Sequence, residues 1–130
     1  MIITSNLSYV SLKSMLCKDK RTGIVACDSC SIACDTGGKK NLDQMAMRLI
    51  QDGYDVVYTG LFPMPCNVEL EQISDFEVDE LLILACDAAV NTFQTLFPAI
   101  KIIPGLDTIG IGAKDAKGNI VTIKDLKKKV

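Results

Sequence analysis

Five of the six cysteines fall in a pattern that could bind a metal. Cys27, Cys30 and Cys34 form a C-x2-C-x3-C motif, and Cys66 and Cys86 lie further along the chain. Iron–sulfur clusters are commonly held by four cysteine thiolates, and closed zinc sites use similar sets. Because the chain has no histidine, imidazole ligands are excluded. The pattern therefore favours a thiolate-ligated centre, either a [4Fe-4S] cluster or zinc.

The same cysteines allow other interpretations. Cys27 and Cys30 also form a C-x-x-C dithiol, which is typical of thiol oxidoreductases. That chemistry needs only two cysteines and leaves Cys34, Cys66 and Cys86 unexplained. Cys66 or Cys86, taken singly, could instead be a small buried apolar side chain. Cys17 lies outside the pattern, and we exclude it from the predicted ligands.

Two other segments could contact a bound group. Gly37 and Gly38 lie in the sequence DTGGKK, where a two-glycine turn would let backbone N–H groups approach a cluster or cradle a phosphate. The segment lacks the glycine spacing of the common nucleotide-binding motifs. Asp107 and Thr108 follow a predicted strand, and they could hydrogen-bond to a ligand or simply close a turn.

Composition limits the remaining possibilities. The chain has 130 residues, of which 48% are hydrophobic and 23% charged. This is the composition of a single domain that spans residues 1–130. The net charge of −2 provides no basic surface for nucleic acid. Without histidine, neither a Ser-His-Asp triad nor a Cys-His pair is possible.

The cysteine content also bears on the cellular compartment. It is lower than that of small domains built on disulfides. The N-terminal residues lack the pattern of a signal peptide, and no apolar run reaches the roughly 18 residues of a membrane span. We therefore expect a cytoplasmic protein that does not enter the membrane. Thiols stay reduced in that compartment, so clustered cysteines are more often metal ligands or redox groups than disulfides.

Short apolar runs alternate with amphipathic stretches, which predicts parallel strands connected by helices. The fold expected is an open three-layer Rossmann-like or flavodoxin-like α/β domain with a mostly parallel sheet. We expect the first helix to be capped at Ser5 or Asn6 and to end before Asp19. The strands are predicted at residues 22–26, 55–59, 80–85 and 101–103, the later helices at 42–50, 68–73 and 90–97, and two short strands around a turn at 114–119.

The predicted strands bring the cysteines together. Cys27, Cys66 and Cys86 each follow the end of a different strand, and Cys30 and Cys34 lie in the loop after the first. The carboxyl ends of parallel strands share one edge of a sheet, where such folds bind ligands. We therefore expect a cysteine cluster at that edge.

The residues also resemble a known family. VACDSCSIACDTGGKK, the isolated Cys66 before a polar residue, LACDAAVNTFQTLFP and PGLDTIGIG are similar in order and spacing to segments of the MetV-type subunit. That subunit is the small zinc- or iron–sulfur-binding companion of methylenetetrahydrofolate reductase in acetogenic bacteria. The resemblance covers about residues 22–112. Its members usually continue into a second cysteine-rich region, which this sequence does not contain.

The resemblance implies a non-catalytic subunit rather than an enzyme acting alone. Its [4Fe-4S] cluster, or zinc, would be held by thiolates among Cys27, Cys30, Cys34, Cys66 and Cys86. The first three would each supply one thiolate, and Cys66 or Cys86 the fourth. The subunit would exchange electrons with a methylenetetrahydrofolate reductase-like or methyltransferase partner of one-carbon metabolism. A partner or a second copy of the chain would shield the cluster from water.

Overall fold

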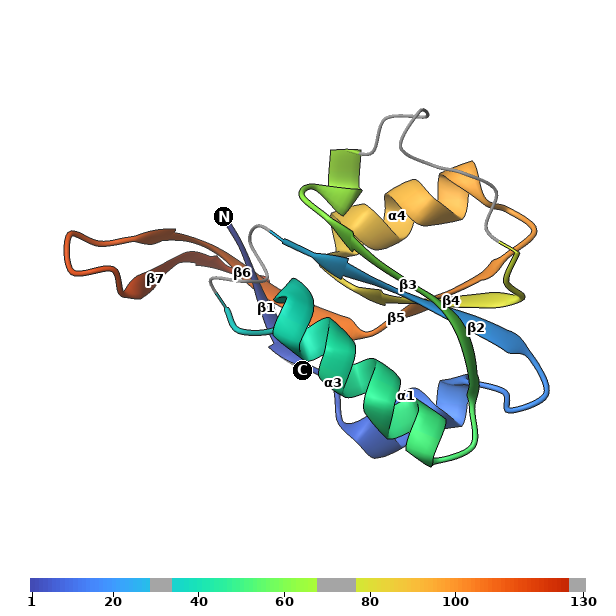
Figure 1. Cartoon of the computed structure of the whole chain (residues 1–130). Coiled ribbons are helices and arrows are strands. Elements are labelled where there is room, and N and C mark those ends of the chain that lie inside the picture. Colours follow the sequence, from blue (N-terminus) through green and yellow to red (C-terminus); the bar gives the residue numbers. More distant parts are fainter. Residues whose placement is uncertain (29–33, 68–76, 127–130) are drawn as a thin grey trace.

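The computed structural model describes residues 1–28, 34–67 and 77–126 (Figure 1). The chain is an α/β protein with two separate sheets. One has four parallel strands in the order β3-β2-β4-β5, and the other has three antiparallel strands in the order β1-β6-β7. Within these ranges, no helix is long and apolar enough to span a membrane.

The described elements match most of the predicted ones, with ends that differ by a few residues. The helix expected at 68–73 lies outside the described residues. The described strands are β1 (Ile2–Asn6), β2 (Arg21–Cys27), β3 (Asp55–Phe62), β4 (Glu80–Leu84), β5 (Lys101–Pro104), β6 (Leu106–Lys114) and β7 (Ile120–Asp125), and the helical segments are α1 (Tyr9–Met15), α3 (Gly38–Gln51), η1 (Pro65–Asn67) and α4 (Asp87–Leu96).

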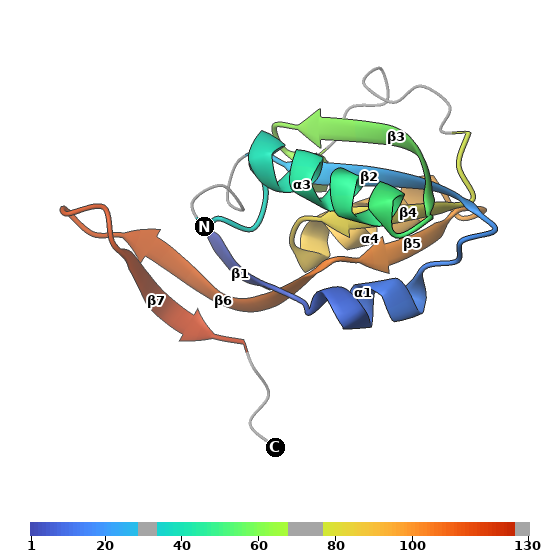
Figure 2. The same ribbon diagram turned by 60° about the horizontal axis from the view of Figure 1, so that its bottom comes forward.

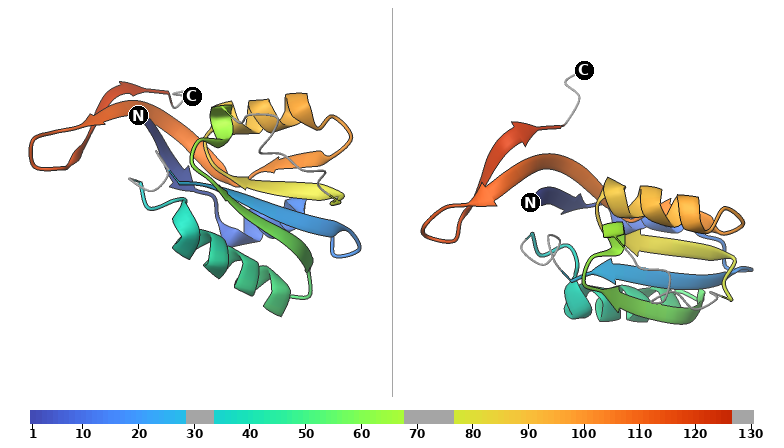
Figure 3. Two further views of the ribbon diagram at one scale, coloured as in Figure 1. Left: turned by 45° about the horizontal axis from the view of Figure 1, so that its top comes forward. Right: turned by 90° about the horizontal axis from the view of Figure 1, so that it is seen from above.

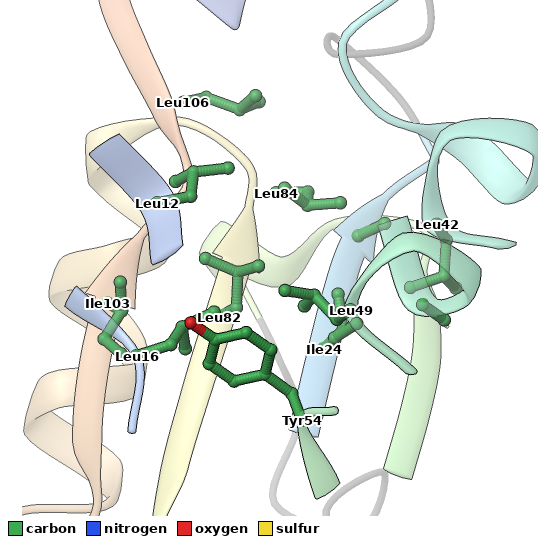
Figure 4. Close-up of a cluster of buried hydrophobic side chains, with 12 residues drawn as sticks. Leu12, Leu16, Ile24, Leu42, Leu49, Tyr54, Leu82, Leu84, Ile103 and Leu106 are labelled. Carbon is green, nitrogen blue, oxygen red and sulfur yellow. The ribbon is translucent and has the colours of Figure 1, made fainter. Parts of the chain in front are cut away.

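The parallel sheet is centred on β2 and β4, which pair with each other. Their residues are buried on both faces, which explains why both strands are almost continuously apolar in sequence. Alternate residues point to opposite sides. Ile24 and Leu82 contribute to the cluster under α1 and α3 (Figure 4), whereas Val25 and Ile83 contribute to the cluster under α4. Helices therefore cover both faces of the sheet (Figure 3).

Helix α3 fits its sequence pattern except at Ile50, which the apolar spacing placed on the buried face but which is 56% exposed. Leu42, Ala46 and Leu49 are buried against the sheet, as their helical spacing predicts. The chain then turns at Gly53, whose φ of 91° lies in the left-handed region that glycine favours. The N–H of Gly53 donates to the carbonyl of Ile50 at 3.1 Å.

The predicted start of the first helix was wrong. Ser8, not Ser5 or Asn6, caps α1, and its Oγ accepts a hydrogen bond from the N–H of Ser11. Ser5 and Asn6 instead belong to β1, which pairs with β6. β6 lies about a hundred residues away along the chain, and the short segment IITSN contains no pattern that predicts this pairing.

The expectation of one mostly parallel sheet was also incomplete. The chain leaves the parallel sheet after β5 and continues through Gly105 into β6, which builds the second sheet with β1 and β7 (Figure 2). The predicted hairpin is present, and Gly118 takes a φ of 83° in its turn. Asp107 and Thr108 lie within β6 rather than in a loop. All six residues of β7 are exposed.

The burial pattern predicts a large contrast between two isoleucines. Replacing Ile24, which is fully buried, with alanine should lower the free energy of unfolding by about 2–5 kcal/mol, because it leaves a cavity between the helices and the sheet. The matched change Ile123→Ala, at a side chain that is 68% exposed, should cost less than about 1 kcal/mol. Urea unfolding of both variants measures the difference, and equal costs would contradict this placement of the core.

Candidate functional site

The crossover connections of the parallel sheet run in opposite directions from β2 and from β4. From β2 the chain crosses through α3 to β3 on one side, whereas from β4 it crosses through α4 to β5 on the other. The loops that follow β2 and β4 therefore diverge at their carboxyl ends. In open α/β sheets this position forms the crevice that binds ligands. The predicted cysteine loops begin at this crevice.

Cys27 is the last residue of β2, and its side chain is 7% exposed. It pairs with Phe62 at the end of β3, and the N–H of Asp28 continues the ladder by donating to the carbonyl of Phe62 at 2.9 Å. Cys27 and Phe62 both belong to the buried cluster under α4. The first cysteine of the motif is therefore held rigidly, on the face that α4 covers.

Cys66 lies on this same face. It belongs to η1, is half-buried and packs against the cluster that contains Cys27. Its carbonyl accepts a hydrogen bond of 2.9 Å from the hydroxyl of Thr92 on α4. This bond holds the backbone of the segment after β3 against α4. No sequence pattern had indicated a role for Thr92.

Cys86 is the N-cap residue of α4, although its side chain makes no capping hydrogen bond, and it lies two residues beyond the end of β4. Its side chain is half-buried. The next residue, Asp87, donates its N–H to the hydroxyl of Thr108 at 3.0 Å. Thr108 therefore anchors the start of α4, whereas Asp107 is exposed and pairs with Ser5 of β1.

Cys34 lies on the other side of the crevice, beside β1. Its Sγ is 3.9 Å from the carbonyl oxygen of Ile2. The buried hydroxyls of Thr36 and Thr4 are 2.6 Å apart and tie this segment to β1. The segment then reaches α3 through Gly37, its N-cap, which is buried like Gly38.

The described candidate ligands thus come from separate segments around one edge of the sheet. Cys27 and Cys66 share a buried cluster, Cys86 begins α4, and Cys34 contacts β1. Cys30 lies outside the described residues. Within the ranges that the structure describes, no group of three or more cysteine, aspartate or glutamate residues is close enough to hold a metal ion.

Cys17 lies at the opposite edge of the sheet. Its N–H donates to Oε1 of Glu80, the first residue of β4, at 2.9 Å. The same oxygen accepts a hydrogen bond of 2.9 Å from the hydroxyl of Thr22 at the beginning of β2. Glu80 is therefore buried with hydrogen-bond partners, as a buried carboxylate requires. Cys17 is exposed and remote from the carboxyl ends of the strands.

Comparison with known proteins gives no match to a family model, to a curated protein sequence or to a solved structure. The candidate site consequently depends on the placement of its own residues. The sequence pattern predicted that the cysteines follow the carboxyl ends of the parallel strands. It did not predict that β1 lies beside Cys34, or that Thr36 bonds to Thr4 of β1. Both contacts join segments that are distant in sequence.

The Thr4–Thr36 contact can be measured with a double-mutant cycle. Thr36→Val should lower the free energy of unfolding by about 1–3 kcal/mol, because it leaves the buried hydroxyl of Thr4 without this partner. The double variant Thr4→Val/Thr36→Val should cost less than the sum of the single changes. Thr95→Val, at an exposed position of α4, is the control. Additive costs in urea unfolding would show that the two hydroxyls do not interact.

Proposed function

We propose that the chain is a cysteine-ligated iron–sulfur protein that acts as an electron-transfer or accessory subunit. The observation that supports this most is the position of Cys27, Cys66 and Cys86. They lie at or just beyond the carboxyl ends of three neighbouring parallel strands, β3, β2 and β4. The crossover connections run in opposite directions from β2 and from β4 at this edge. This is where α/β folds of this kind place a bound group.

The strand order supports a finer assignment of the fold. Counted along the chain, the parallel strands lie in the order 2-1-3-4. Flavodoxin-like domains have the order 2-1-3-4-5 and bind their cofactor at the carboxyl ends of the first and third strands. Those strands correspond here to β2 and β4. We therefore propose an open three-layer flavodoxin-like domain with its ligand site at the ends of β2 and β4.

The proposed ligands are Cys27, Cys30 and Cys34, together with Cys66 or Cys86. Sulfur donors are the set that a [4Fe-4S] cluster takes, and such a cluster supplies reversible one-electron transfer when it is bound. The protein would hold it through thiolates and exclude water with the buried cluster behind Cys27 and Cys66. The backbone N–H groups near Gly37 and Gly38 would raise its potential by hydrogen bonding to sulfur.

Burial of Cys27 argues against the dithiol alternative. The attacking cysteine of a C-x-x-C oxidoreductase must be a reactive thiolate that its substrate can reach. Cys27 is 7% exposed and lies within a strand rather than at the start of a helix. A metal ligand needs no such access by a protein substrate, so the cysteine pattern fits ligation better than thiol exchange.

An accessory role is supported by the second sheet. β7 is an outer strand, and among the described strands its partner is β6. It exposes the side chains of Ile120, Val121 and Ile123. An unpaired strand edge with apolar side chains is typical of surfaces that associate with another protein. Together with the resemblance to MetV-type subunits, this supports a partner of the methylenetetrahydrofolate reductase or methyltransferase class in the cytoplasm.

The metal content tests this proposal directly. Protein purified without oxygen should be brown, contain iron and sulfide in similar amounts, and lose visible absorbance when dithionite reduces the cluster. The measurement is an absorption spectrum with iron, sulfide and zinc assays on one sample. Colourless protein with stoichiometric zinc would replace the electron-transfer role with a structural or docking one. Protein that takes up neither metal would contradict both.

The cysteine motif provides a matched pair of variants. Cys30→Ser should lose its bound iron, because it removes one of three closely spaced thiolates, and Cys34→Ser should behave alike. Cys17→Ser is the control, since Cys17 is exposed at the opposite edge and should not affect iron binding. Iron per chain is the readout, and full occupancy in Cys30→Ser would contradict the ligand assignment.

A further inference from the structure

A second feature lies at the same edge of the sheet, on the face away from Cys27. A cavity of about 220 Å³ opens between α1, α3 and the end of β4. Leu12 of α1 and Leu84 of β4 form part of its wall, and both belong to the buried cluster under α1 and α3 (Figure 4). Cys27 and Cys66 belong to the other cluster. The cavity therefore opens on the face of the sheet away from Cys27 and Cys66, although Thr36 of its lining lies two residues beyond Cys34.

The polar lining has one sign of charge. Asn6, Asn41, Gln44 and Thr36 contribute amide and hydroxyl groups, and Arg48 contributes a guanidinium. Among the described residues that line the cavity, Arg48 is the only charged one. A cation beside the side-chain amides of Asn6 and Gln44, with no carboxylate among the described lining residues, is suited to an anionic group.

Arg48 is held in place by its neighbours. Its guanidinium lies 3.8 Å from the centroid of the Tyr9 ring, and the Nζ of Lys13 lies 4.8 Å from the same centroid. The Tyr9 hydroxyl donates to Oδ2 of Asp52 at 2.5 Å. Partial burial and this bond raise the pKa of Tyr9 to about 12, so its hydroxyl stays protonated and keeps donating at neutral pH.

Asn41 is also oriented. Its Nδ2 donates to the carbonyl of Gly37 at 2.7 Å and to Oδ1 of Asp35 at 3.3 Å. Helix α3 begins beside these residues, and its N-cap Gly37 has no side chain to bond the first N–H groups. The partial positive charge of this helix start adds to that of Arg48.

The rest of the lining is apolar. Leu7, Leu12, Met45 and Leu84 contribute hydrocarbon surface. An inorganic anion would leave this surface without a partner, whereas an organic anion could cover it. A water molecule takes up about 30 Å³ in the liquid, so the volume suits a molecule of roughly seven to ten non-hydrogen atoms. It is smaller than the roughly 300–1,000 Å³ of sites for larger ligands.

We propose that this cavity binds a small organic anion, a carboxylate with an apolar body. Its charged group pairs with Arg48 and the side-chain amide of Gln44, and its body lies against Leu12 and Leu84. The position at the carboxyl end of β4 is one where open α/β sheets bind ligands. This site differs from the proposed metal centre in its charge and in its lining, although Thr36 and the start of α3 adjoin the segment that carries Cys34.

The probe for this site is 4-fluorobenzoate, observed by fluorine NMR while the intact protein is titrated at constant ionic strength. Binding should be saturable. Arg48→Gln should weaken it roughly tenfold or more, as loss of a hydrogen bond to a charged group does. Gln44→Glu should also weaken it, because a carboxylate would then face the anion. Both side chains are exposed, so neither change threatens the core.

Lys40→Gln is the matched control, because it removes one positive charge from α3 outside the cavity lining and should leave the affinity within twofold. Inorganic phosphate should compete only weakly, since it lacks the apolar body. Equal affinity in Arg48→Gln and the native protein, no saturable binding, or phosphate binding as tight as that of fluorobenzoate would each overturn the proposal. The iron content of the same variants should not change. Loss of anion binding can therefore be distinguished from failure of the proposed metal assignment.

Discussion

The pairing of β2 with β4 is the constraint on which the rest of the structure depends. These two strands are buried on both faces, and their parallel register places Cys27 and the residues before Cys86 at one edge. Their crossover connections then run in opposite directions, which opens the sheet at that edge. The burial of Ile24, Val25, Leu82 and Ile83 thus does more than stabilise the chain. It also places the carboxyl ends of the strands at one edge, where open α/β sheets bind ligands.

The central sheet was predictable because its signals are local. Apolar runs such as residues 22–26 and 80–85 are typical of strands that are buried on both faces. The spacing of Leu42, Ala46 and Leu49 places these side chains on one face of α3, which packs against the sheet. Gly53 lies just beyond that helix, and its φ of 91° lies in the left-handed region that favours glycine. The edge that carries the cysteines followed from the same pattern, since parallel strands place their carboxyl ends together.

The second sheet was not predictable in the same way. β1 contains Ser5 and Asn6, which have good capping side chains and therefore favoured a helix start when only neighbours were considered. Pairing with β6 overrides that local preference, because five backbone positions of β1 find partners in a distant strand. The contacts that secure the site, Thr4 with Thr36 and Thr92 with Cys66, are equally nonlocal. Residue types alone do not indicate them.

β1 also connects the two sites at the carboxyl edge. The carbonyl of Ile2 contacts Cys34, Thr4 bonds to Thr36, and Asn6 lines the cavity. Thr36 itself lines that cavity, only two residues beyond Cys34. Thr36 therefore belongs both to the lining of the cavity and to the segment that carries Cys34, and one buried hydrogen bond holds it to β1. The cysteine site and the anion cavity differ in chemistry, but they share the strand that supports them.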